Sequence, residues 1–95
     1  MTTKFTQFVE GIERTSSPEE RAALAAARRR FSIGARLLQR RLAAGLTQQQ
    51  LAEASEVPQS EISRIERGQA NPTARTLEAL GRPLGVVLDY TPLDT

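Results

Sequence analysis

The fold is decided by LTQQQLAEASEVPQSEISRIERGQANPT, the stretch from Leu46 to Thr73 of a 95-residue chain. Its Thr47–Gln50 segment has the threonine–glutamine pattern of a capping box and predicts a short helix that ends near Ser55. Pro58 begins a second predicted helix, which stops at Gly68. Two short helices joined by a tight turn form a helix-turn-helix if their inner faces meet. The apolar positions that can share one small core are Leu46, Leu51, Ala52, Val57, Ile62 and Ile65.

The outer arc of the second predicted helix carries only neutral and basic polar groups. Ile62 and Ile65 lie within about 60° of each other on a helical projection and mark the inner face. The opposite arc holds Gln59, Ser60, Ser63, Arg64 and Arg67. Their amide, hydroxyl and guanidinium groups match the base edges of the DNA major groove. The acids Glu61 and Glu66 fall outside this arc, as a DNA-facing surface requires.

Toward the N-terminus, the sequence predicts a helical extension followed by a basic helix. A short amphipathic helix is expected over residues 3–13, with Phe5, Phe8 and Ile12 on one face. Ser17 and Glu20 then form a second capping box, which predicts a helix running toward Arg30 that continues or breaks over residues 31–34. An apolar stripe of Ile33, Leu37, Leu38 and Leu42 follows before Gly45.

Toward the C-terminus, one more helix and a short strand are predicted. Residues 71–73 read as a turn before a helix that carries Leu77, Leu80 and Leu84, and Gly85 ends it. A strand is expected over residues 86–90. An isolated strand leaves backbone groups unpaired, so pairing with a second copy predicts a homodimer through Val86, Val87, Leu88 and Tyr90. Such a dimer places two reading helices about 34 Å apart and requires a palindromic operator.

Composition narrows the function classes. The chain contains no cysteine and no histidine, which removes disulfides, thiolate nucleophiles, imidazole bases and nearly all zinc chemistry. We therefore expect that the protein is not an enzyme and that it binds no cofactor and no metal. The net charge is +2, but residues 21–47 hold seven arginines and no acid. Such a basic block can contact phosphates, can bind acidic partners, or can simply form a helix face exposed to solvent. We see neither a signal peptide nor a membrane-spanning run, and expect a cytoplasmic, nucleoid-associated protein.

The central stretch resembles the phage-repressor helix-turn-helix family (Cro/C1, also called XRE). The matching positions are Arg41, Gly45-Leu46-Thr47-Gln48, Leu51-Ala52, Ile62, Ile65-Glu66, Gly68 and Pro72. The resemblance implies an all-α, phage-repressor-like bundle and base contacts from Gln59, Ser60 and Arg64. The DNA-backbone contacts that it implies come from Gln48, Ser63, Arg67, Gln69, Asn71 and Thr73. It also implies that Gln48 braces the reading helix, and that Arg41 and Glu66 form a buried, structural ion pair.

Two positions depart from the family pattern. Glu56 stands where the family usually has glycine in the turn, so the left-handed conformation there is expected to be strained or absent. Pro58 replaces a hydroxyl cap, which removes a hydrogen bond without breaking the helix. Both changes are expected to shift the reading helix only slightly.

Three functions remain open. The overall plan is similar to antitoxins of the RelE/HigB type, and HipB-type antitoxins also carry this domain followed by a strand. That resemblance implies autoregulation of an operon and a protein toxin, with Phe5, Phe8 and Ile12 as candidate toxin-binding residues. The alternatives are a stand-alone repressor and a protein-interaction adaptor that does not bind DNA. The predicted divisions are an extension at 1–30, the DNA-binding domain at 31–85, and a strand and tail at 86–95.

Overall fold

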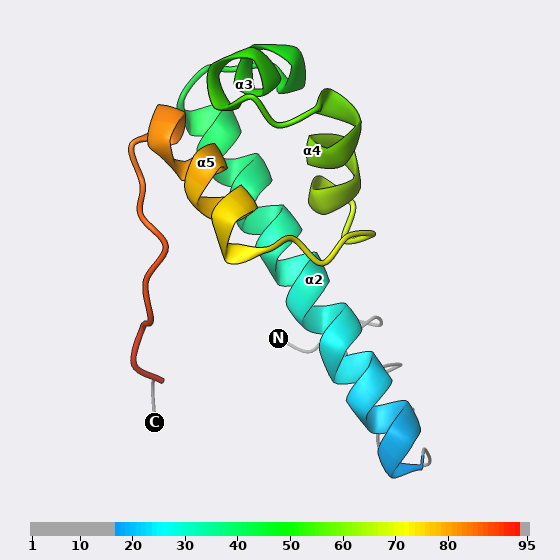
Figure 1. The fold of residues 1–95 in the computed structure, drawn as a ribbon. Helices are drawn as coiled ribbons and strands as arrows, with labels where there is room; N and C mark the ends of the chain where they lie inside the picture. Colours follow the sequence, from blue (N-terminus) through cyan, green and yellow to red (C-terminus); the bar gives the residue numbers. More distant parts are fainter. Residues whose placement is uncertain (1–16, 94–95) are drawn as a thin grey trace.

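The computed structural model describes residues 17–93 and contains only helices within that range. They are α2 (Pro18–Ala43), α3 (Gln48–Ser55), α4 (Gln59–Glu66) and α5 (Ala74–Leu84). Helix α2 packs on α4, while α3 packs on both α4 and α5 (Figure 1). The predicted all-helical bundle is confirmed, and no helix between residues 17 and 93 is long and apolar enough to cross a membrane. The predicted helix at 3–13 lies outside the described residues.

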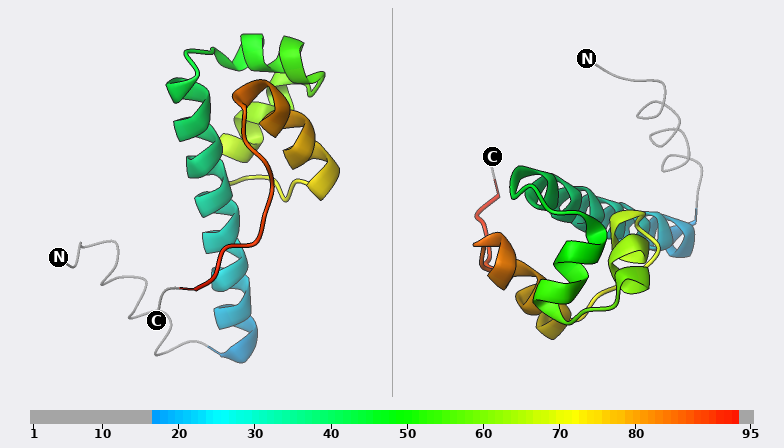
Figure 2. Two further views of the ribbon diagram at one scale, coloured as in Figure 1. Left: turned by 90° about the vertical axis from the view of Figure 1, so that its left-hand side faces the viewer. Right: turned by 90° about the horizontal axis from the view of Figure 1, so that it is seen from above.

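Helix α2 is continuous over residues 31–34, where the sequence left open whether the helix continues or breaks. The Ser17 side chain accepts a hydrogen bond from the Glu20 N–H at 3.2 Å, and the Glu20 carboxylate accepts one from the Ser17 N–H at 3.4 Å. These two bonds form the predicted capping box. The helix then runs past residue 30, where the extension was expected to end, and stops at Ala43. Its N-terminal half projects beyond the other helices (Figures 1 and 2).

Gly34 explains why α2 continues where the sequence left a break open. A Cβ at this position would collide with the Ile65 carbonyl oxygen and lie 2.9 Å from the Glu66 carbonyl oxygen. Glycine lowers helix propensity by roughly 1 kcal/mol relative to alanine. Here the missing side chain lets the α2 backbone rest directly on the end of α4. The glycine therefore marks a helix crossing rather than a helix end.

The turn between α3 and α4 contains a residue in the left-handed conformation that is not a glycine. Glu56 has φ of 63° and ψ of 17°, and its N–H donates to the Ala52 carbonyl at 2.9 Å. Of the two alternatives expected for Glu56, a strained or an absent left-handed conformation, the second is wrong. Left-handed backbone costs an L-residue roughly 1–2 kcal/mol, so the turn carries this strain. Pro58 follows as the residue before α4, with no side-chain cap.

The core gathers between the four helices, largely as predicted. The buried side chains are Leu37, Leu51, Val57, Ile62, Ile65 and Leu80, and the partly buried ones packed against them include Leu46 and Ala52. The placement of Leu42 on the apolar stripe is wrong, because this residue is 61% exposed. It sits in the last turn of α2, next to the buried Arg41 but exposed itself.

The predicted C-terminal strand is absent from the described chain. Gly85 ends α5 with φ of 72°, and the Val86 N–H donates to the Gly81 carbonyl at 3.0 Å. Residues 86–93 then continue in neither a helix nor a strand, within the range that the structure describes. The physical reason is that strand geometry depends on a hydrogen-bonded neighbour, and none of the described elements offers a sheet edge.

Candidate nucleic-acid interface

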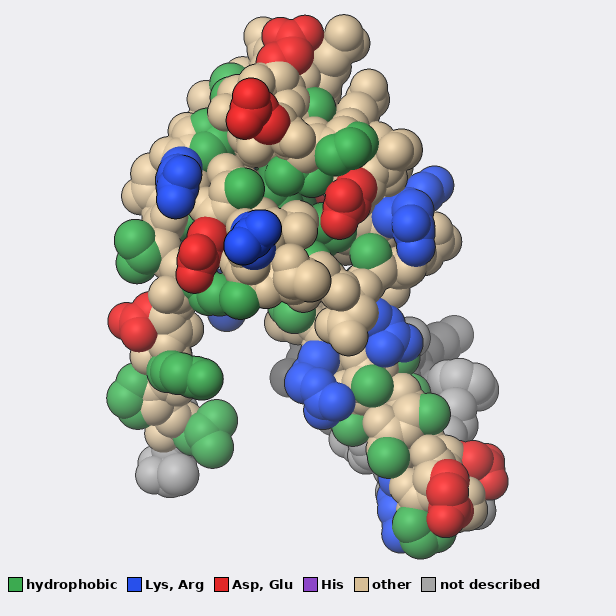
Figure 3. All heavy atoms as spheres, in the orientation of Figure 1, with side chains coloured by type: hydrophobic (Ala, Val, Ile, Leu, Met, Phe, Trp, Pro, Cys, Tyr) green, Lys and Arg blue, Asp and Glu red, His purple; other side chains and the backbone are tan. Residues whose placement is uncertain are grey.

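A hollow of about 430 Å³ opens on the outward face of α4. Its lining consists of Gln48, Gln59, Ser60, Ser63, Arg64 and Arg67. It brings together the three residues predicted to read bases and three of those predicted to contact the DNA backbone. Arginine side chains lie on this side of the molecule in Figure 3. The lining residues belong to α4, to Arg67 directly after it and to the first residue of α3.

The orientation of α4 follows from its two isoleucines. Ile62 and Ile65 are fully buried, so the residues on the opposite face point outward. No acid lines the hollow among the described residues. Its groups are amides that donate and accept, hydroxyls that do both, and guanidinium groups that only donate. Such a set can bond base edges and phosphates. Among residues 17–93 no group of histidine, cysteine or acidic side chains could hold a metal ion.

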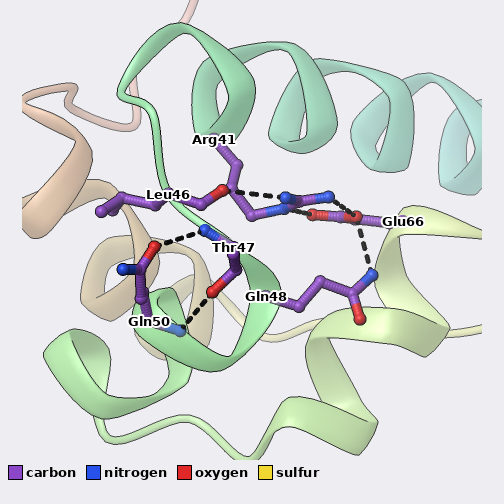
Figure 4. A network of polar contacts seen from close by, with 6 residues as sticks. All are labelled: Arg41, Leu46, Thr47, Gln48, Gln50 and Glu66. Atoms are coloured by element: carbon purple, nitrogen blue, oxygen red, sulfur yellow. Dashed lines mark hydrogen bonds and ion pairs between the residues drawn. The ribbon is translucent and has the colours of Figure 1, made fainter.

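Arg41 and Glu66 form the ion pair that fixes α4 against α2. Arg41 Nε donates to Glu66 Oε2 at 2.7 Å and Arg41 Nη2 to Glu66 Oε1 at 2.9 Å, a bidentate arrangement (Figure 4). The two side chains are 10% and 5% exposed. Burial acts to raise the pKa of the Glu66 carboxyl, but hydrogen bonds from Arg41 and Gln48 outweigh it and lower that pKa. The hydrogen bond to Glu66 raises the pKa of Arg41.

Two further contacts extend this pair into a network. Gln48 Nε2 donates to Glu66 Oε1 at 3.0 Å, which braces α4 from the start of α3. Arg41 Nη1 donates to the Leu46 carbonyl at 2.9 Å, just before the Thr47–Gln50 capping box (Figure 4). One guanidinium group therefore links α2, the loop before α3 and the end of α4. Sequence reasoning missed the Leu46 contact, because a backbone carbonyl carries no residue-type signal.

The remaining predicted backbone-contacting residues follow α4 and lie outside the lining of the hollow. The Gln69 N–H donates to the Arg64 carbonyl at 2.8 Å, which turns the chain away from the helix. Asn71 is exposed on the same turn. Thr73 caps α5, since its hydroxyl oxygen accepts from the Thr76 N–H at 3.2 Å. The candidate toxin-binding residues Phe5, Phe8 and Ile12 lie outside the described residues.

All the residues that line the hollow fall within the segment that matches a known protein family. A family model described as helix-turn-helix matches residues 37–90, more than half of the chain. A relative from Haemophilus influenzae, named an uncharacterized HTH-type transcriptional regulator, is 42% identical over 64 residues. The match covers 67% of this chain and 65% of the relative, so the chain spans slightly less than two thirds of the relative's length. No solved structure matches the chain.

Proposed function

The chain belongs to the helix-turn-helix family, and from this premise we propose that it is a sequence-specific DNA-binding transcriptional repressor. The observation that carries the proposal is the hollow on α4, where six polar side chains converge without an acid. The name of the Haemophilus influenzae relative, an HTH-type transcriptional regulator, supports the same reading. Bound across a promoter, such a protein blocks transcription by occupying the DNA.

In the proposed complex, α4 enters the major groove with its first turns toward the bases. Gln59 and Ser60 stand in the first turn and Arg64 one turn later, on the same face. An arginine bonds guanine O6 and N7 bidentately, and a glutamine bonds adenine N6 and N7. Gln48 is held by Glu66 at the rim and contacts phosphate. The ion-pair network keeps α4 rigid, so these groups are pre-positioned for the groove.

Replacing Arg64 by alanine is expected to separate base reading from backbone contact. Arg64→Ala should weaken binding to the cognate duplex by about 1–3 kcal/mol and leave random DNA little changed, because it removes a base contact. Gln48→Ala should weaken both duplexes more evenly. Fluorescence anisotropy on the two duplexes measures the difference. An equal loss for Arg64→Ala on cognate and random DNA contradicts the base-reading role.

The repressor is proposed to act as a homodimer through residues 86–90. A groove of about 290 Å³ lies between α2 and α5, lined mainly by apolar side chains that include Ile33, Leu84 and Leu88. Val87 also lines this groove and is 87% exposed, while Tyr90, later in the same segment, is 98% exposed. The same segment of a second copy, paired in an antiparallel way, offers partners to the backbone between Val86 and Tyr90, whose own N–H groups are already bonded, and covers these side chains. The two α4 helices then meet successive major grooves of a palindromic operator.

A charge within the apolar segment is expected to separate the dimer. Leu88→Asp places a carboxylate where the segments would meet, while Thr91→Asp adds the same charge beyond that stretch as the matched control. Light scattering at micromolar concentration should give twice the chain mass for the parent and for Thr91→Asp, and the single mass for Leu88→Asp. A monomeric parent at this concentration counts against the dimer.

The repressor is further proposed to be the antitoxin of a type II toxin–antitoxin pair. Support comes from the projecting half of α2, because no residue between Pro18 and Phe31 belongs to the core cluster. The candidate toxin-binding residues precede it in the chain. We would purify the tagged chain at native level from its own host and identify what accompanies it. A stoichiometric small basic protein, lost on deletion of residues 1–30, supports the antitoxin. Recovery of the chain alone, still bound to its own promoter, favours a stand-alone repressor.

A further inference from the structure

The N-terminal half of α2 is longer than the core needs. The residues from Pro18 to Arg30 span roughly 20 Å at the helical rise, yet the first buried residue of α2 is Gly34. In Figure 1 and in the right panel of Figure 2, this half extends on the side of α4 and away from α5. It therefore projects along the side of the molecule that carries the hollow.

The projecting half is strongly basic beyond its first turn. Its only acids are Glu19 and Glu20 at the start, and no acid follows before Thr47. Arg29 is exposed and Arg30 is half-buried. Figure 3 shows basic side chains on α2 directly below the globular part. A face of this sign attracts phosphate, and the attraction is strongest where several charges lie close together.

This basic half is continuous with the proposed DNA interface. A Cβ on Gly68, just after α4, would lie 3.1 Å from the Phe31 Cα, so the end of α4 rests on α2 at that residue. Arg30 precedes Phe31 and lies one turn before Gly34, nearly on the face that meets α4. Arg67 directly precedes Gly68, so it lies near the arginines of α2. The acid at this junction, Glu66, has a buried side chain that is paired with Arg41.

We propose that the projecting half of α2 is a second DNA-binding element, in which Arg29 and Arg30 contact phosphates flanking the half-site read by α4. This inference rests on the proposed function. A length of roughly 20 Å corresponds to about six base pairs at 3.4 Å per step. The contact is to phosphates, so it adds affinity and footprint without adding sequence preference. This contact makes no use of Phe5, Phe8 and Ile12, the candidate toxin-binding residues.

The test compares Arg29→Gln/Arg30→Gln with Arg75→Gln/Arg82→Gln, which removes the same charge from α5. The full chain is titrated against the duplex selected from random DNA, once with natural flanks and once trimmed by about six base pairs at each end. We expect the first variant to bind the long duplex at least about tenfold more weakly than the control variant, and the trimmed duplex equally well. The slope of log affinity against log salt should fall by roughly two for each chain.

Two outcomes overturn the inference. The first is equal binding of both variants to the long duplex, which assigns the basic face to a protein partner or to solvent. The second is an equal loss on long and trimmed duplexes, which places the arginines within the half-site. Failure of the proposed function looks different, because the parent chain then shows no preference for any duplex. In that case unrelated duplex DNA still tests the arginines, since phosphate contacts persist there.

Discussion

Arg41→Ala is expected to destabilise the chain by about 3–5 kcal/mol, because it leaves the Glu66 carboxylate buried with only Gln48 as a partner. A small domain has roughly 5–15 kcal/mol of stability in total, so the variant should lose a large share of it. Arg40→Ala is the matched control, since Arg40 is exposed on the same turn of α2. Urea unfolding followed by circular dichroism gives both values. A change in Arg41→Ala no larger than that in Arg40→Ala contradicts a structural role for the pair.

The same substitution has a pH signature. In the parent the pKa of Glu66 is lowered, so the stability from the pair is present above the ordinary carboxyl pKa and is lost as pH falls through the lowered value. In Arg41→Ala, burial still acts to raise the pKa of Glu66, but the hydrogen bonds from Arg41 that opposed it are gone. Protonation of Glu66 then relieves the buried charge. The difference in unfolding free energy between parent and variant should therefore be larger at pH 7 than at pH 4. A pH-independent difference contradicts this cause.

Gly34→Ala is expected to destabilise the chain although alanine favours helices. The added Cβ collides with the backbone at the end of α4, where carbonyl groups cannot rotate away as a side chain does. Overpacking of this kind costs about 1–3 kcal/mol, against a propensity gain of roughly 1 kcal/mol. Because α4 must shift, DNA binding should weaken as well. Thermal unfolding and anisotropy measure the two effects.

Ser32→Ala serves as the control for Gly34→Ala, since it raises helix propensity at an exposed position two residues away. It should be neutral or slightly stabilising and leave DNA binding unchanged. If Gly34→Ala is also neutral or stabilising and leaves DNA binding unchanged, this contradicts the close contact between the α2 backbone at Gly34 and the end of α4.

Features of the fold that depend on local chemistry could be predicted from sequence. Both capping boxes form with the predicted partners, Ser17 with Glu20 and Thr47 with Gln50. The alternation of buried and exposed positions on α4 was predictable because Ile62 and Ile65 repeat at the helical period. For the same reason the sequence predicted which polar residues of α4 share one face, and the hollow gathers them.

Features that depend on tertiary contact could not be predicted. Gly34 was ambiguous because sequence alone does not tell a helix break from a helix crossing. Leu42 continues an apolar pattern, but nothing in the sequence shows that this position is exposed in the fold. The strand expected at residues 86–90 needs a neighbour that one chain does not provide. Secondary-structure propensity predicts none of these three features, because each depends on the part of the protein that packs against the residue.

The central claim, that α4 reads DNA sequence, is tested most directly by selection from a random duplex library with the purified full chain. We predict enrichment of a palindromic motif whose half-sites are centred about one helical turn apart, lost when Arg64 is replaced by alanine. We also predict a steep fall in affinity with salt. Recovery of an unenriched library by a folded chain contradicts the claim and favours a protein-interaction adaptor.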